Sequence, residues 1–188
     1  TPSFYIIKKK YLPKKIFFGW DYILLNKNKK KSKLKNKFDI LISFGGSDPN
    51  HLTEFVLKFF LKYKFNLKIC CLIGYLNKRK KEIQKICNKS NGRIKSYQPK
   101  KNIDKYVNES KFVVISIGLT SYEAIFFNTQ ALFIPIKKID IKLAKYFENL
   151  QLGISSPYFE NLSYPILNNK IKKLINKKKM NKPNKQII

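Results

Sequence analysis

Two glycine turns contain the residue types best suited to chemistry in this sequence. Residues 44–49 read FGGSDP and residues 116–123 read SIGLTSYE, and each turn follows an apolar run and precedes a helical pattern. Glycine lets the backbone approach a ligand closely, and the N–H groups that open a helix favour an anion. Two such turns about one βαβαβα unit apart predict a site for a nucleotide or a nucleotide-sugar.

The second turn predicts the stronger grip on phosphate. The N–H groups of Leu119, Thr120 and Ser121 follow Gly118 at a helix start, where they could cradle a diphosphate. Glu123 lies one turn further, where its carboxylate could accept both hydroxyls of a ribose. An equally weighted alternative is a capping box, in which Thr120 caps the helix and Glu123 returns to the Thr120 amide.

The first turn carries an acidic residue that changes its interpretation. Asp48-Pro49 is typical of a helix entry, with Pro49 near the first helical position. A carboxylate at Asp48 competes with phosphate for the helix N–H donors, so we expect this loop to face a sugar hydroxyl or another domain. The alternative is a tight turn in which Asp48 only caps the helix.

Other reactive residues are few. His51 is the only histidine, and we interpret it as an exposed residue of a first helical turn. Cys70, Cys71 and Cys87 make no C-x-x-C spacing, and the first two lie in an apolar run typical of the core of a reduced, cytoplasmic protein. One histidine without spaced thiols makes no convincing metal site, and we expect no metal and no cofactor.

Apolar runs alternate with helical patterns from residue 38 onward. Strands are predicted at 38–44, 67–73, 93–97, 112–117 and 131–136, and helices from 52, at 78–88, 103–108, 120–127, 140–151 and about 165–177. Strands separated by helices of this length pair in parallel with right-handed crossovers. The predicted fold class is α/β, with a Rossmann-like, doubly wound parallel sheet.

The composition is strongly basic, with 40 Lys+Arg, 11 Asp+Glu and a formal net charge of +29. Such a charge raises the alternative of a nucleic-acid-binding module. Only Arg79 and Arg93 are arginines, although proteins that read phosphates and bases rely on the bidentate guanidinium. We therefore interpret the charge as codon bias on a solvated surface and do not expect nucleic acid as a partner. No apolar stretch is long enough to predict a membrane span.

The pattern also predicts a domain organisation. Residues 26–37 are almost uniformly polar and basic, which is typical of an extended linker. Residues 1–25 hold two apolar patches, which we interpret as the remnant of a preceding N-terminal domain. Residues 38–178 form the predicted nucleotide-sugar-binding domain, and residues 179–188 form a basic tail.

Three segments together resemble a known family. They are LISFGGSDP at 41–49 with Leu52-Thr53, GLTSYEA at 118–124, and GWDYILL at 19–25. This combination resembles the C-terminal domain of the PseG/SpsG-type UDP-sugar hydrolases of pseudaminic acid biosynthesis, which are related in fold to the GT-B glycosyltransferase MurG. The resemblance spans roughly residues 16–160 and implies the C-terminal half of a GT-B fold.

The resemblance implies roles for the second turn and its surroundings. Gly118, Leu119 and Thr120 would hold the diphosphate and Glu123 the ribose. Backbone near Tyr97 and Gln98 would meet the uracil.

The resemblance also implies a cleft and a reaction. Gly45, Gly46 and Ser47 would line the cleft floor, and Asp140 falls where relatives place a polar contact to the sugar. The catalytic histidine of this family belongs to the N-terminal domain, so no catalytic residue is expected here and that domain is the expected partner. The implied hydrolase cleaves UDP-2,4-diacetamido-2,4,6-trideoxy-β-L-altropyranose to UDP and free sugar.

The sequence departs from the family at two places. Ile117 stands where the family usually has glycine, and Ile141, Lys142 and Leu143 supply no amide after Asp140. A GT-B glycosyltransferase, with the same donor site but an acceptor in place of water, is the alternative enzyme.

Overall fold

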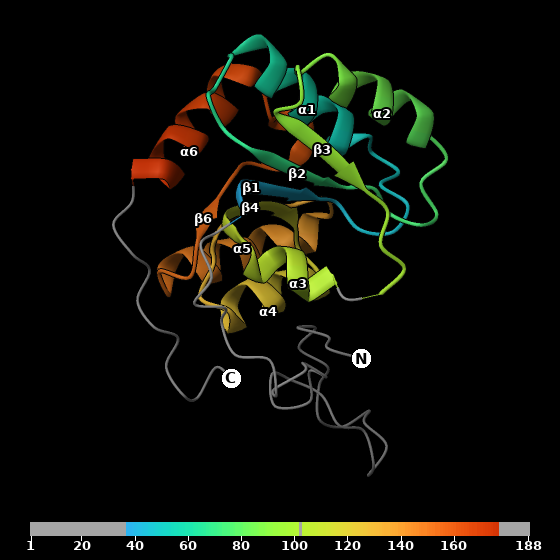
Figure 1. The fold of residues 1–188 in the computed structure, drawn as a ribbon. Coiled ribbons are helices and arrows are strands. Elements are labelled where there is room, and N and C mark those ends of the chain that lie inside the picture. The colour runs from blue at the N-terminus through green and yellow to red at the C-terminus, as the bar shows by residue number, and fades with distance from the viewer. Residues whose placement is uncertain (1–36, 102, 177–188) are drawn as a thin grey trace.

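The computed structural model describes residues 37–101 and 103–176, which alternate between strands and helices (Figure 1). The strands are β1 (Phe38–Ser43), β2 (Ile69–Leu72), β3 (Ile94–Tyr97), β4 (Ser110–Ser116), β5 (Gln130–Ile134) and β6 (Ile154–Ser155). The helices are α1 (Leu52–Lys62), α2 (Lys80–Asn88), α3 (Ile103–Asn108), α4 (Leu119–Phe126), α5 (Lys138–Asn149) and α6 (Tyr164–Asn176), with a short 3-10 helix at Phe159–Asn161. The predicted domain remnant at 1–25, all but the last residue of the predicted linker, and the predicted tail at 179–188 lie outside the described residues.

All strand pairs of the six-stranded sheet are parallel, in the order β3-β2-β1-β4-β5-β6. This order is the one found in Rossmann-like, doubly wound folds, so the predicted fold class is confirmed. The chain leaves β1 toward β2 and β3 on one side, and later returns to place β4, β5 and β6 on the other. Ser43, the last residue of β1, pairs with Leu72 and with Ile115, so the carboxyl ends of these three strands meet at one edge.

Helices cover both faces of the sheet, as Figure 1 shows, with α1, α2 and α6 on one face and α3, α4 and α5 on the other. Alternation along the central strands separates the two cores. In β1, Ile40 and Ile42 pack in the core under α1, α2 and α6, whereas Leu41 packs in the other. Strands buried on both faces read as continuous apolar runs, which is why the sequence predicted β1, β4 and β5 so clearly.

The sequence prediction missed two short elements, β6 and the 3-10 helix. β6 has only two residues and is the edge strand beside β5, so it leaves no period-2 pattern in the sequence. The predicted helix boundaries differ from those observed by two residues or fewer, and α3 was predicted with its observed limits. Within the described residues, no helix is long and apolar enough to cross a membrane.

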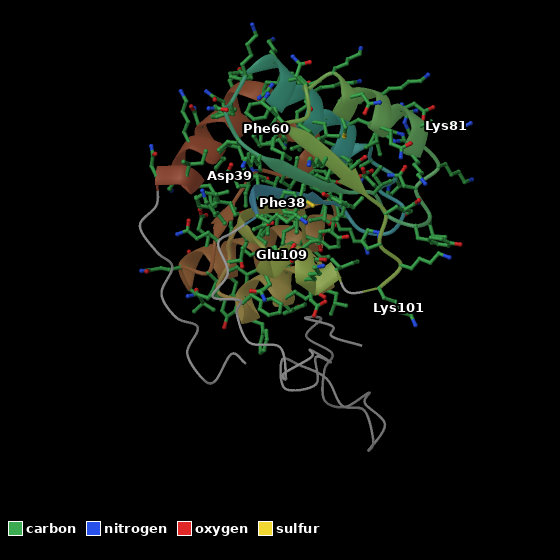
Figure 2. The ribbon with its side chains drawn as sticks, viewed as in Figure 1. Phe38, Asp39, Phe60, Lys81, Lys101 and Glu109 are labelled. Atoms are coloured by element: carbon green, nitrogen blue, oxygen red, sulfur yellow. The ribbon has the colours of Figure 1, made fainter. Side chains whose placement is uncertain are left out.

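Most charged side chains lie at the surface of the fold, and among the described residues the carboxylates of Asp48 and Glu54 are buried. Figure 2 shows Lys81 and Lys101 projecting from the surface, while Phe60 lies inside the fold. The basic residues therefore surround an apolar interior that does not depend on them.

Candidate functional site

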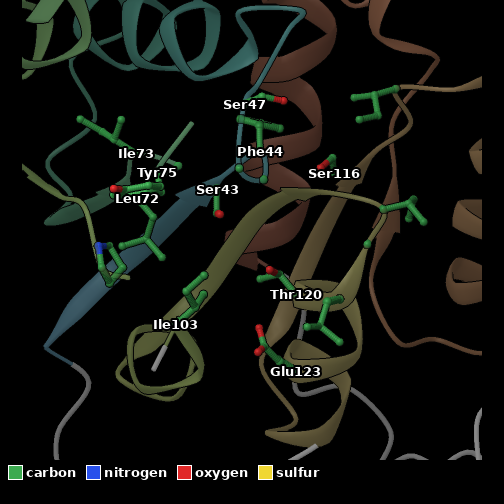
Figure 3. A pocket seen from close by; sticks show the side chains of 18 of the residues that line it. Ser43, Phe44, Ser47, Leu72, Ile73, Tyr75, Ile103, Ser116, Thr120 and Glu123 are labelled. Carbon is green, nitrogen blue, oxygen red and sulfur yellow. The ribbon is translucent and has the colours of Figure 1, made fainter. Parts of the chain in front are cut away.

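A pocket of about 560 Å³ lies at the carboxyl edge of the sheet (Figure 3). It is lined by the ends of β1, β2 and β4 and by the loops that follow β3 and β5. The strand order reverses between β1 and β4, so this is the topological switch point, where open α/β sheets bind their ligands. Both predicted glycine turns, 73 residues apart between Gly45 and Gly118, line this one pocket.

The second glycine turn is held by Ser121, whose side chain is fully buried. The Gly118 N–H donates to Ser121 Oγ over 3.1 Å, and the Ser121 hydroxyl donates to the Ser116 carbonyl over 3.2 Å. In return, the Ser121 N–H donates to the Gly118 carbonyl over 3.0 Å. Ser121 therefore fixes the path from β4 into α4.

In this arrangement the N–H groups of Gly118 and Ser121 are hydrogen-bonded, and those of the two residues between them are not engaged by it. Within the described chain, no acceptor is recorded for the N–H groups of Leu119 and Thr120, the first two residues of α4. The first N–H groups of a helix have no intrahelical partner and carry its partial positive charge. Leu119 and Thr120 both line the pocket, so these two donors are available to an anion there.

The capping box considered for Thr120 and Glu123 does not form. α4 begins at Leu119 with Gly118 as its N-cap, and the reciprocal bonds run between Gly118 and Ser121. Thr120 and Glu123 instead line the pocket, and Figure 3 shows their side chains next to each other on α4. A hydroxyl and a carboxylate one turn apart are thus presented to the same space.

The residues of the first glycine turn have two roles: some line the pocket, and one caps α1. Gly45, Gly46 and Ser47 line the pocket. Asp48 lies outside the lining and is 5% exposed. Its Oδ1 accepts the Leu52 N–H over 3.0 Å and its Oδ2 accepts the Thr53 N–H over 2.9 Å. Asp48 thus caps α1 and occupies the first two N–H groups of this helix.

Gly74, which the sequence analysis did not single out, closes the floor between β1 and β2. A Cβ on Gly74 would lie 2.1 Å from the Gly46 carbonyl oxygen and 2.2 Å from that of Gly45. Only glycine permits this approach, which brings the Leu76 N–H within 3.0 Å of the Gly46 carbonyl. The signal in the sequence was a glycine directly after an apolar strand, as at Gly45.

Three further residues at the mouth of the pocket were also missed. Tyr75 is 62% exposed, and the Lys100 ammonium lies 5.6 Å from the centroid of its ring. Lys137, which precedes α5, lines the same pocket and is exposed. Nothing in the sequence distinguishes Lys100 or Lys137 among so many lysines. The lining of the pocket therefore contains two cations, Lys100 and Lys137, and one carboxylate, that of Glu123.

Three other predicted residues do not join the lining. The Tyr97 ring packs against Tyr106 at 5.3 Å, its carbonyl accepts the Ile73 N–H, and burial raises the pKa of its hydroxyl. Gln98 donates from Nε2 to the Gly74 carbonyl over 3.4 Å. Asp140 accepts the Lys137 N–H at Oδ2 over 2.9 Å and so caps α5. Their predicted ligand contacts stay predictions.

Among the described residues, the lining of the pocket contains no histidine and no cysteine. His51 lies exposed before α1, outside the lining. All three cysteines are buried, and burial raises the pKa of the Cys70 thiol to about 12. In residues 37–101 and 103–176, no group of three or more His, Cys, Asp or Glu residues is placed to hold a metal ion.

Comparison with known proteins gives one distant similarity. No family model matches the sequence. The chain is 29% identical over 162 residues to "Uncharacterized protein MJ1062" of Methanocaldococcus jannaschii, an alignment that covers 81% of this chain. The chain spans only 31% of the length of that protein. This similarity assigns the chain no family.

Proposed function

We propose that this chain is the nucleotide-sugar-binding half of a PseG-type hydrolase that cleaves a UDP-sugar to UDP and free sugar. The observation that carries the proposal is the meeting of both predicted glycine turns in one pocket at the switch point of the sheet. Neither turn alone distinguishes a ligand site from a simple turn. Their convergence from β1 and β4 is what a dinucleotide-like or nucleotide-sugar ligand requires.

The phosphate end of the ligand is assigned to α4. The unpaired amides of Leu119 and Thr120 give two N–H donors with the partial positive charge of the helix behind them. Lys100 and Lys137 add mobile positive charge at the mouth. A diphosphate carries the charge and the multiple acceptor oxygens that suit this set of donors.

The sugar ends of the ligand are assigned to the two sides of the phosphates. In this proposal the carboxylate of Glu123, which lines the pocket with Thr120 beside it, accepts both hydroxyls of the ribose. Gly45, Gly46 and Ser47 line the opposite wall, where the second sugar would lie against bare backbone. A pocket of about 560 Å³ falls within the range of small-molecule sites, roughly 300–1,000 Å³.

The proposal assigns different roles to this chain and to the N-terminal domain, because the lining of the pocket contains no histidine. Binding and orientation come from this chain, and the group that activates water belongs to the N-terminal domain that the resemblance implies. The pocket is open at its mouth, beside the exposed Tyr75, which leaves room for that domain to approach the donor.

Titration of the full chain with UDP by calorimetry tests the proposal. Glu123→Ala is expected to weaken UDP binding by roughly 1–3 kcal/mol, the typical cost of losing a hydrogen bond to a charged group. Glu160→Ala is the matched control, because Glu160 is exposed on the 3-10 helix and outside the pocket. Equal UDP affinity in folded Glu123→Ala and wild type would remove Glu123 from the site.

The second part of the experiment measures the affinity of the chain for a mixed-sequence DNA at several salt concentrations. We expect measurable UDP binding and weak, non-saturating DNA binding. Absence of UDP binding together with a steep salt dependence on DNA would replace the proposal by a nucleic-acid-binding function.

A further inference from the structure

A second cavity, of about 310 Å³, lies at the opposite edge of the sheet, where β1, β2 and β3 begin. Four of its seven lining residues are cationic, and none is acidic: the lining consists of Lys37, Phe38, Lys68, Ile69, Gly92, Arg93 and Lys95. We call these four cations the amino-edge cluster. The proposed nucleotide-sugar site uses none of them.

The fold itself brings the cluster together. Lys37, Lys68 and Arg93 each directly precede one of three adjacent parallel strands. The register of the sheet sets Lys68 beside Arg93, and Lys37 lies two residues before Asp39, which is level with Lys68. The Lys68 carbonyl accepts the Asp39 N–H over 2.8 Å, and the Arg93 carbonyl accepts the Ile69 N–H over 2.8 Å. The backbone under the cations is therefore fixed by the sheet ladder.

Asp39, at the start of β1, pairs with a cation outside the cluster. Asp39 Oδ1 pairs with the Lys111 ammonium at 2.7 Å, and Asp39 Oδ2 accepts the Lys68 N–H over 2.8 Å. The Lys68 ammonium also attracts this carboxylate, but Asp39 is not part of the cavity lining. The four positive charges therefore have no counter-charge in the lining of their cavity.

Arg93 and Gly92 shape the cavity for an anion with several oxygens. The Arg93 guanidinium donates from Nη1 to the Phe65 carbonyl, which holds the planar group while its other N–H donors remain for a ligand. The turn before it contains Asn91 at φ 52° and Gly92 at φ 80°. A Cβ on Gly92 would meet nothing within 4 Å, so the space beside Arg93 is open.

We propose that the amino-edge cluster binds an anion made of linked phosphate groups, with Arg93 as the fixed donor and Lys37, Lys68 and Lys95 as the mobile ones. Several linked phosphates match the four cations that line one cavity, whereas a single carboxylate would leave most of them unpaired. The source of the phosphates is an inorganic chain, and a nucleotide is the alternative source that the test separates.

Amide NMR spectra of the full chain, recorded during titration with inorganic tripolyphosphate in about 0.15 M salt, test the proposal, because such salt screens long-range attraction to the basic surface. The amides of Lys68, Gly92 and Arg93 are expected to shift and saturate together. A second titration uses UDP. Shifts of the Gly118 and Thr120 amides in that titration indicate binding at the proposed nucleotide site, at the other edge of the sheet. Failure of either site is therefore seen separately.

A matched pair of double variants separates a built site from general charge. Lys68→Gln/Lys95→Gln should weaken tripolyphosphate binding about tenfold or more, since each lost ammonium removes charge-assisted hydrogen bonds. Lys80→Gln/Lys81→Gln removes the same charge from exposed positions at the start of α2, the helix that leaves the carboxyl edge, and should change the affinity less than twofold. In Figure 2, Lys81 lies at the far side of the view from Asp39.

Three results would overturn the proposal. Equal weakening in both double variants would show general attraction to a basic surface. Tripolyphosphate shifts confined to Gly118 and Thr120 would assign the phosphates to the switch-point pocket alone. Saturation of the Gly92 and Arg93 amides by UDP at lower concentration than by tripolyphosphate would make a nucleotide the ligand of this cavity.

Discussion

Replacing Gly74 by alanine is expected to disrupt the floor of the pocket. The added Cβ would lie 2.1 Å from the Gly46 carbonyl oxygen, 2.2 Å from that of Gly45 and 2.4 Å from the Gly46 carbonyl carbon. Observed Cβ contacts below 3.0 Å are essentially unknown, and here every neighbour is backbone. Gly74 is not at positive φ, so the penalty is steric and not conformational.

The magnitude follows from how little the neighbours can yield. The Gly45-Gly46 loop is anchored by β1 on one side and, through Asp48, by α1 on the other. To accept a methyl group, it must separate from the β2 loop by about an ångström, which breaks the bond from the Leu76 N–H to the Gly46 carbonyl. Overpacking costs typically about 1–3 kcal/mol, and we expect the upper end because flexible side chains cannot absorb the strain.

Urea unfolding with unchanged m-value, followed by UDP titration, measures both consequences. Gly118→Ala is the control, since Gly118 has an extended φ of 173° and a Cβ there would meet nothing within 4 Å. Its stability should stay within about 0.5 kcal/mol of wild type, as for changes away from special features. Gly74→Ala with wild-type stability, or no less stable than Gly118→Ala, would refute this account of the pocket floor.

Two further predictions concern the helix behind the first turn. Asp48→Ala removes the acceptor of two α1 amides and should lower the free energy of unfolding by about 1–2 kcal/mol in urea; an unchanged value would contradict the capping role. Glu54, which is buried, accepts hydrogen bonds from Arg79, and these lower the pKa of its carboxyl. Because its folded pKa lies below the unfolded one, its contribution is present at neutral pH and is lost as pH falls through the folded value. Urea midpoints from neutral to acid pH should therefore fall less steeply in Glu54→Gln; parallel profiles would argue against this linkage.

The fold could be predicted from the sequence because its signals are local. β1, β4 and β5 are apolar runs, and α1 has a stripe of apolar residues at helical spacing, so element type and the parallel class followed. β6 could not be predicted, since a two-residue edge strand exists only through its pairing with Leu132 and Phe133 of β5. Its existence is a property of the assembled sheet.

The candidate site was predictable only in part, for the same reason. Gly45 and Gly118 mark their turns in the sequence, but which side chain caps each helix depends on backbone geometry. Asp48 was expected to face a sugar or another domain, with capping as the alternative, and its oxygens bond to two α1 amides. The alternative considered for α4 used Thr120 as the cap. The observed N-cap is Gly118, two residues earlier, so the side chain that completes the cap is that of Ser121.

This shift of the cap supports the proposal that α4 binds phosphate. If Thr120 had capped α4, its hydroxyl and Glu123 would have been used to satisfy the helix's own amides. Ser121 instead performs that task from a buried position, while Thr120 and Glu123 line the pocket. At α1 the opposite holds, since Asp48 occupies the amides that an anion would need. The two glycine turns are thus unequal: Asp48 occupies the first two amides of α1, whereas the first two amides of α4 have no acceptor among the described residues.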